Sequence, residues 1–420
     1  MTPPLALPRP VTVGAALSSA ALIAGVAAFP SAALAQEEWD LYAENAWAID
    51  QVNAEDVWAT TKGEGMTVAV VDTGIAEEHP FLEDKNILDG ESFVLSEEDS
   101  ARFDTDGHGT GVSAAVLYAA PEATVLPVRV YPTTADIGFS TGAGQNRFDG
   151  IRWAADNGAN VMVIPWIEVM AGEDREPAPE FLEAVQYAID KDIVVIAGGG
   201  NDPELDQVPN PASFPGVIAV SGTDKDGNAW SMNTTGPEIV LAGPADTMIF
   251  PIPQIVSFGE EDLYFQAAGT SAASGIVGGA AALVRAAHPD LDASNVIQRL
   301  ITTADDGGQG RTEELGFGLV DAAAAVTATD VETVAENPLG YPMGEAGASG
   351  ASPDEEPGSE ASEEVVSTSD AAADNAADSG SGLTPIMAVA VALLLVAAAV
   401  VVWLVLRSRS RSKARVQPWQ

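Results

Sequence analysis

Short apolar runs alternate with amphipathic stretches over the middle of the chain. Four runs rich in β-branched residues have the length of buried strands: Met66–Val71, Val125–Tyr131, Asn160–Pro165 and Ile193–Ala197. The spacing of apolar positions predicts helices over His108–Tyr118, Phe148–Asn157, Glu180–Asp190, Ala272–Ala287 and Asp292–Thr303. Strands that are apolar on both faces and separated by helices predict an α/β fold, with a mostly parallel sheet and helices on both faces.

Two longer apolar segments flank this middle region. Residues 1–35 contain one Arg, an apolar run and Ala33-Leu34-Ala35, the pattern of a secretory signal peptide; an uncleaved anchor helix is the alternative. Near the other end, Ile386–Leu406 carries no charge, and 21 residues at about 1.5 Å each cross a ~30 Å hydrocarbon core. We expect residues 383–406 to form one C-terminal transmembrane helix.

The charge distribution predicts on which side of a membrane each part of the chain lies. The 420 residues include 18 Lys and Arg against 62 Asp and Glu, a formal net charge of −44. All 62 acids lie in residues 36–382 with 12 of the basic residues, whereas residues 407–420 hold five basic residues and no acid. The positive-inside rule predicts a single-pass cell-membrane protein, with residues 36–382 outside and the basic tail 407–420 in the cytoplasm.

Composition narrows the function classes. An acidic balance this strong argues against a nucleic-acid partner. The chain has no cysteine, which excludes disulfides, zinc–thiolate sites and a cysteine nucleophile. Residues 331–382 are mostly Ala, Gly, Ser, Pro and acids, so we expect a disordered acidic linker there. The folded part then comprises a short N-terminal extension over 36–61 and one domain over 62–330.

Three short motifs carry residues suited to nucleophilic catalysis: Val71-Asp72-Thr73-Gly74, Asp106-Gly107-His108-Gly109-Thr110 and Gly269-Thr270-Ser271-Ala272. A Ser hydroxyl is a weak nucleophile unless a base takes its proton and a third group orients that base. The motifs supply a carboxylate, an imidazole and a hydroxyl, on Asp72, His108 and Ser271. Each of the three stands among small residues that permit another group to approach closely. His79 and His288 each precede Pro, and we expect them at a surface turn and at a helix end.

These motifs, in this order, resemble those of the subtilisin-like serine proteases, the subtilases. The resemblance runs from about residue 62 to residue 325 and includes the closing motif Gly316–Asp321. It implies that Ser271 is the nucleophile, His108 the general base and then acid, and Asp72 the group that orients His108. The implied substrates are proteins or peptides.

The resemblance extends to an Ala-Gly-Gly-Gly-Asn segment, in which Asn201 and the Ser271 backbone N–H would stabilise the oxyanion. No cofactor is implied. A structural calcium ion is not indicated either, because Asp224–Asn228 fits a hairpin turn better than a calcium loop.

Two departures from the family pattern concern the substrate and the nucleophile helix. Pro165 and Trp166 stand where subtilases have a Ser-Leu pair in the segment that pairs with the substrate backbone. Pro165 has no N–H to donate and Trp166 is bulky, so we expect these substrate-binding positions to narrow the specificity. Gly275 replaces a usual Pro, which changes the start of a helix and no reacting group.

The order of segments resembles the mycosins, which are membrane-anchored subtilases of type VII secretion. Only 36 residues separate the predicted cleavage site from Asp72, too few for a classical pro-domain, although mycosins usually carry cysteine pairs. This implies the type VII secretion membrane complex as a partner. Two alternatives stay open: a housekeeping surface subtilase, and a catalytically weak scaffold or peptide-binding pseudoprotease.

Overall fold

The computed structural model describes residues 39–94, 100–134, 144–168, 178–256, 263–340 and 417–418. The described residues from Asp40 on belong to a single unit. The predicted signal peptide, most of the predicted linker and the predicted transmembrane helix lie outside the described residues. Within the described ranges, no helix combines the length and the apolar character needed to cross a bilayer.

A parallel sheet forms the centre of the unit. Its strands are β1 (Thr67–Asp72), β2 (Asn86–Ile87), β3 (Glu91–Ser92), β4 (Thr124–Arg129), β5 (Val161–Ile164), β6 (Val194–Gly198), β7 (Ile218–Thr223) and β8 (Ile239–Pro244). They are ordered β2-β4-β1-β5-β6-β7-β8, and β3 also pairs with β4. The four predicted strands are β1, β4, β5 and β6, with ends displaced by one or two residues. The carboxyl ends of these parallel strands therefore lie at one edge of the sheet.

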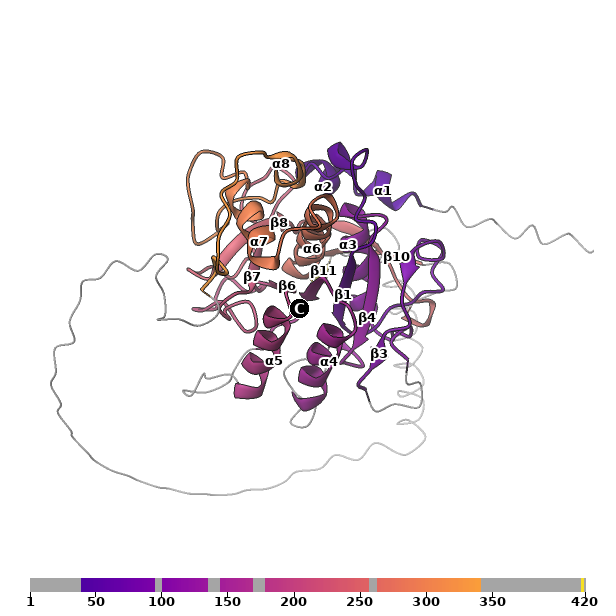
Figure 1. Cartoon of the computed structure of the whole chain (residues 1–420). Helices are drawn as coiled ribbons and strands as arrows, with labels where there is room; N and C mark the ends of the chain where they lie inside the picture. The colour runs from indigo at the N-terminus through magenta and orange to yellow at the C-terminus, as the bar shows by residue number, and fades with distance from the viewer. Residues whose placement is uncertain are drawn as a thin grey trace, which may run out of the picture. The chain divides into compact units, whose positions relative to one another are not determined.

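Helices cover both faces of this sheet, which confirms the predicted fold class. They are α3 (His108–Ala119), α4 (Gly144–Asp156), α5 (Pro179–Asp190), α6 (Thr270–Ala287), α7 (Ala293–Thr302) and α8 (Ala322–Thr327). In Figure 1, α4 and α5 lie together on one face, and α3 and α6 lie on the other. The five predicted helices correspond to α3 to α7.

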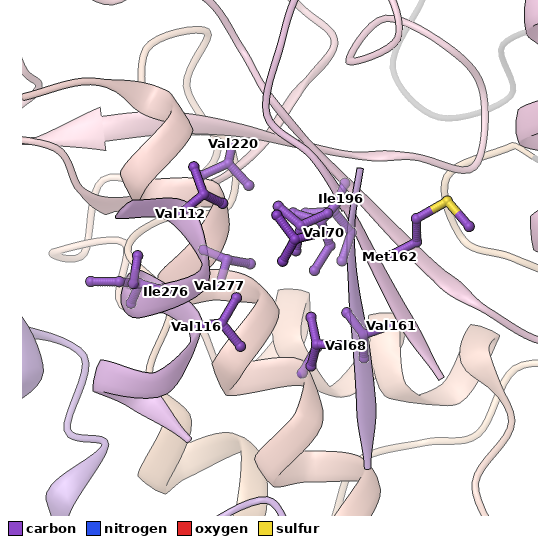
Figure 2. Packing of buried hydrophobic residues seen from close by; sticks show 14 of the residues in the cluster. Val68, Val70, Val112, Val116, Val161, Met162, Ile196, Val220, Ile276 and Val277 are labelled. Carbon is purple, nitrogen blue, oxygen red and sulfur yellow. The ribbon is translucent and has the colours of Figure 1, made fainter. Parts of the chain in front are cut away.

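The core between α6, α3 and the sheet consists mainly of small β-branched side chains. Figure 2 shows valines of α3 and α6 beside Val68 and Val70 of β1. On β5, Val161 faces these residues while Met162 points away, as the two-residue period of a strand requires. The apolar runs are thus buried on both faces.

Two glycines bring α6 close to α3. A methyl group on Gly275 would lie 2.9 Å from the Val112 carbonyl oxygen, and one on Gly279 would lie 2.5 Å from that of Val116. Only glycine fits at such backbone contacts. The departure at Gly275 therefore serves helix packing as well as the start of α6.

Residues 40–61, most of the predicted N-terminal extension, pack into the same body as the predicted domain. They form α1 (Leu41–Glu44), α2 (Ala46–Gln51) and the short helix η1 (Glu55–Val57). Asn45 is fully buried between them, and its amide both accepts from and donates to the backbone of Ile249, with each bond at 2.8 Å. Burial of Leu41 and Ile49 joins this segment to the main core.

The described end of the domain extends past the predicted start of the linker. The backbone N–H of Val334 donates to Asn295, and that of Gly216 donates to the Leu339 carbonyl. These bonds hold residues 334–339 against the domain, although the composition of 331–382 predicts disorder.

An antiparallel hairpin leads into α6. It consists of β9 (Met248–Pro251), the helical turn η3 (Gln254–Val256) and β10 (Tyr264–Ala268), and the two-residue strand β11 (Gln417–Pro418) pairs parallel with β10. The rest of the predicted cytoplasmic tail lies outside the described residues.

Candidate active site

Asp72 and His108 meet at the carboxyl edge of the sheet. Asp72 ends β1, His108 begins α3, and both side chains are buried. The His108 Nδ1 atom lies 2.9 and 2.8 Å from the two Asp72 carboxylate oxygens. A carboxylate at this distance keeps the proton on Nδ1, which leaves Nε2 as the basic nitrogen of the ring.

Glycines and hydroxyls around Asp72 hold the start of α3 in place. The Gly109 N–H donates to Thr73 Oγ1 at 2.9 Å. A methyl group on Gly109 would overlap the Gly74 carbonyl and lie 3.1 Å from the Asp72 β-carbon. The small residues of both motifs are therefore what lets α3 approach the end of β1.

Asp104 fixes the same turn from the other side. Its carboxylate accepts N–H bonds from Asp106, Gly107 and Thr110 and the hydroxyl bond from Thr110. Burial raises the pKa of Asp104, and these four hydrogen bonds oppose that rise. Asp104 is thus a structural loop acid, and Asp72 is the acid that contacts the imidazole.

The electrostatics of His108 favour its protonated form. Burial alone lowers the pKa of His108, but the charge of Asp72, their hydrogen bond, and the charges of Asp106 and Asp104 together outweigh burial. The net pKa is raised above the ordinary value of 6.5. Protonated His108 therefore stabilises the fold below pH 6.5, and this contribution is lost as pH rises through the folded-state pKa.

Ser271 lies in the first turn of α6, one residue after the first residue of the helix. Its hydroxyl donates to the Pro165 carbonyl oxygen at 3.1 Å. The dipole of α6 favours negative charge at this end of the helix. The site therefore suits an anion that forms beside Ser271.

Asn201, after the end of β6, is oriented by Thr270, the neighbour of Ser271. Its Oδ1 accepts the Thr270 N–H at 2.8 Å and the Thr270 hydroxyl at 2.9 Å. Because a backbone N–H can only donate, these bonds identify Oδ1 and set Nδ2 on the opposite branch of the amide. The sequence alone does not single out Thr270, which there is only a small residue before Ser271.

The two predicted substrate-binding residues, Pro165 and Trp166, have different surroundings in the structure. Pro165 directly follows β5, which is a central strand and not an edge strand, and its carbonyl contacts the nucleophile candidate. The Trp166 side chain is 2% exposed and donates from Nε1 to the Val71 carbonyl at 2.9 Å. Its indole therefore lies in the core and does not line a substrate cleft.

The other histidines serve structural roles. His79, expected at a surface turn, is instead buried; it accepts the Phe81 N–H on Nδ1 and contacts the Leu263 carbonyl through Nε2 at 2.9 Å. Burial lowers the pKa of His79 to about 4, so it is neutral at neutral pH. His288 caps the C-terminal end of α6, as predicted.

The described residues include no group of three or more His, Cys, Asp or Glu that could hold a metal ion. The segment Asp224–Asn228 is the predicted hairpin turn. The Asp224 carboxylate accepts the N–H groups of Asp226 and Asn228, and Thr223 pairs antiparallel with Ala229.

The comparisons with known proteins agree with this geometry. The model of the subtilase family, Peptidase_S8, matches residues 63–318. The chain belongs to the subtilases. It is therefore a serine protease by family, and its substrates are proteins. The match ends at Gly318, inside the closing motif predicted from the sequence.

Individual subtilases cover most of the described domain. Subtilisin DY of Bacillus licheniformis is 32% identical over 289 residues, which cover 66% of this chain and 97% of the relative. Mycosin-4 of Mycobacterium tuberculosis is 31% identical over 316 residues, which cover 66% of this chain and 68% of the relative. The solved MycP3 protease from the type VII (ESX-3) secretion system superimposes with a TM-score of 0.55 at 26% identity, covering 67% of this chain and 88% of that one.

Proposed function

We propose that this subtilase hydrolyses peptide bonds through Asp72, His108 and Ser271. The observation that supports it most directly is the buried pair of hydrogen bonds between His108 Nδ1 and the Asp72 carboxylate, 2.9 and 2.8 Å long. A buried imidazole paired in this way is the base that a serine nucleophile requires.

In the proposed reaction, His108 Nε2 takes the Ser271 hydroxyl proton as Oγ attacks the scissile carbonyl. The hydroxyl rests on the Pro165 carbonyl, so it turns from that acceptor towards His108 when substrate binds. Asp72 stabilises the imidazolium that forms. His108 then gives its proton to the leaving amine, and water repeats the sequence to release the acyl group from Ser271.

Asn201 and the Ser271 backbone N–H would hold the oxyanion during both steps. The Asn201 amide is already oriented by Thr270, so no reorganisation is needed as charge develops. Narrow specificity rests on Pro165, which has no N–H for a substrate strand. The buried indole of Trp166 gives no support to it.

Substitution of the nucleophile tests the proposal. Ser271→Ala should abolish fluorophosphonate labelling and reduce peptide hydrolysis by roughly 10⁴-fold or more, because triad residues act as a unit. Asn201→Ala should cost roughly 10²- to 10³-fold in kcat, the loss seen on removing the oxyanion amide of a related subtilisin. Asn157→Ala, which removes an exposed amide at the end of α4, is the control. A wild-type protein without labelling or hydrolysis would favour the pseudoprotease alternative.

We also propose that the domain is anchored outside the cell by residues 383–406 and works with a type VII secretion complex. The support is the charge partition around the uncharged span and the similarity to mycosins.

Protease added to intact spheroplasts should release the domain in soluble form and leave an epitope after Gln420 protected. Cleavage of that epitope, or protection of the domain, would reverse the orientation. Deletion of the gene should impair export of type VII substrates and be rescued by wild-type protein but not by an anchor-less chain. Unchanged export would leave the housekeeping alternative.

A further inference from the structure

Trp166 joins two strand ends that carry residues of the site. The paired register between β1 and β5 ends at Val70 and Val163. Beyond it, the Trp166 Nε1–H donates to the Val71 carbonyl at 2.9 Å, one residue before Asp72. A side chain therefore continues the cross-strand bonding where the backbone ladder stops.

The backbone next to Trp166 holds the nucleophile candidate. The Pro165 carbonyl accepts the Ser271 hydroxyl at 3.1 Å. It also lies against β6, because a methyl group on Gly198 would come within 3.2 Å of it. The position of residues 165–166 thus sets where the Ser271 hydroxyl rests relative to the strand that carries Asp72.

The indole is confined by aromatic rings from separate elements. It stacks on Phe181 of α5, with ring centres 5.4 Å apart, and meets the Tyr131 ring edge-on at 5.3 Å. The Arg147 guanidinium of α4 lies 5.6 Å from its centre, donates to the Tyr131 hydroxyl at 2.8 Å and pairs with Glu168. In a close-packed cluster of this kind, the indole cannot shift without moving its neighbours.

We propose that Trp166 is a positioning residue for catalysis: its indole ties the end of β1 to the segment after β5 and thereby sets the Ser271 hydroxyl relative to the Asp72–His108 pair. This inference rests on the proposed function of those three residues. It replaces substrate contact, which the sequence suggested for Trp166, with an effect on the reaction itself.

Trp166→Phe removes the N–H donor and keeps an aromatic ring in the cluster. We expect kcat to fall by about fivefold or more, because small displacements of reacting groups are costly, while KM and peptide preference stay within about twofold. Trp58→Phe is the matched control, since Trp58 Nε1 donates to the Ala119 carbonyl at the same 2.9 Å, at the far end of α3. Its kcat should stay within about twofold of wild type at a comparable loss of stability.

Stoichiometric labelling by a fluorophosphonate separates this inference from the proposed function. Wild-type protein that labels slowly or not at all would overturn both. Wild-type and Trp166→Phe proteins that label at equal rates would overturn the inference alone, and so would a change confined to KM or peptide preference. If Trp166→Phe does not fold, benzothienylalanine at position 166 keeps the bicyclic shape without the donor and must show the same fall in kcat.

Discussion

His108 titrates in the field of three carboxylates, of which Asp72 is hydrogen-bonded to the ring. Asp106 and Asp104 act on it through charge and also raise the pKa of His108. Asp104 is buried inside the turn that begins α3, whereas Asp106 is partly exposed and accepts the Thr134 N–H and hydroxyl. Asp106 is therefore the position where this field can be changed with little risk to the fold.

Asp106→Asn should move the acid limb of kcat/KM to lower pH. Removal of a negative charge lowers the pKa of His108, so more of the imidazole is neutral, and able to act as a base, at a given acidic pH. The plateau at high pH should stay within about twofold. Asp290→Asn, at the opposite end of α6 from Ser271, should leave the profile in place. An unmoved or raised limb in Asp106→Asn would contradict the role assigned to this charge.

At the scale of single residues, the sequence predicted which site residues would meet better than it predicted which side chains would be buried. Asp72 and His108 stand in short motifs whose small residues mark a close approach, and their hydrogen bonds confirm that they meet. The burial of Trp166 and His79 could not be predicted, because each is held by a backbone carbonyl and by aromatic rings that lie far away in the sequence.

Two helices set the distance between the base and the nucleophile candidates. His108 begins α3, Ser271 lies in the first turn of α6, and the helices touch at Gly275 and Gly279. A side chain at either glycine separates the two helices before it affects any reacting group.

Gly279→Ala should destabilise the fold by about 1–2 kcal/mol and lower kcat. The added methyl group gains about 1 kcal/mol of helix propensity, but overpacking against the Val116 carbonyl costs about 1–3 kcal/mol or more. Urea unfolding and steady-state kinetics measure both effects. Gly158→Ala is the control, because it strains a residue at φ +89° in open space and should lose about 1 kcal/mol with unchanged kcat. Equal kcat in the wild-type, Gly279→Ala and Gly158→Ala proteins would show that the spacing between α3 and α6 does not affect turnover.

Elements with sustained periodicity were predicted closely, and short ones were not. The runs that became β1, β4, β5 and β6 are apolar on both faces over most of their length, because both faces of the sheet are covered. The helices α1 and α2 have four and six residues, too few to show a 3.6-residue period. Their place in the core is fixed by Asn45, a polar residue that hydropathy counts as exposed.

At the scale of the whole molecule, like charge opposes folding. Residues 36–340 hold 52 acids and 12 basic residues, a net charge of −40, and a compact domain brings these charges closer together than an unfolded chain does. Salt reduces this repulsion, since the Debye length falls from about 30 Å at 0.01 M to about 3 Å at 1 M.

The melting temperature should therefore rise by roughly 5 °C between 0.01 and 1 M NaCl, the equivalent of about 1–2 kcal/mol for a domain of this size. Calorimetry of the full chain in a non-ionic detergent measures it. Choline chloride should act like NaCl, because screening depends on ionic strength and not on a bound sodium ion. A flat or falling melting temperature would show that the charges are already neutralised locally.

The bonds of Asn45 have a further consequence for the order in which the chain folds. Its partner, Ile249, lies 204 positions later in the sequence, and the next bond of the same segment, from Gln51 to Asp224, spans 173. The segment that leaves the ribosome first is thus among the last to acquire its partners. At a synthesis rate of roughly 5–20 residues per second, it waits some 10–40 s. Contacts of such sequence separation also close slowly, so the newly made enzyme passes through an interval in which other proteases, or its own finished copies, can cut it.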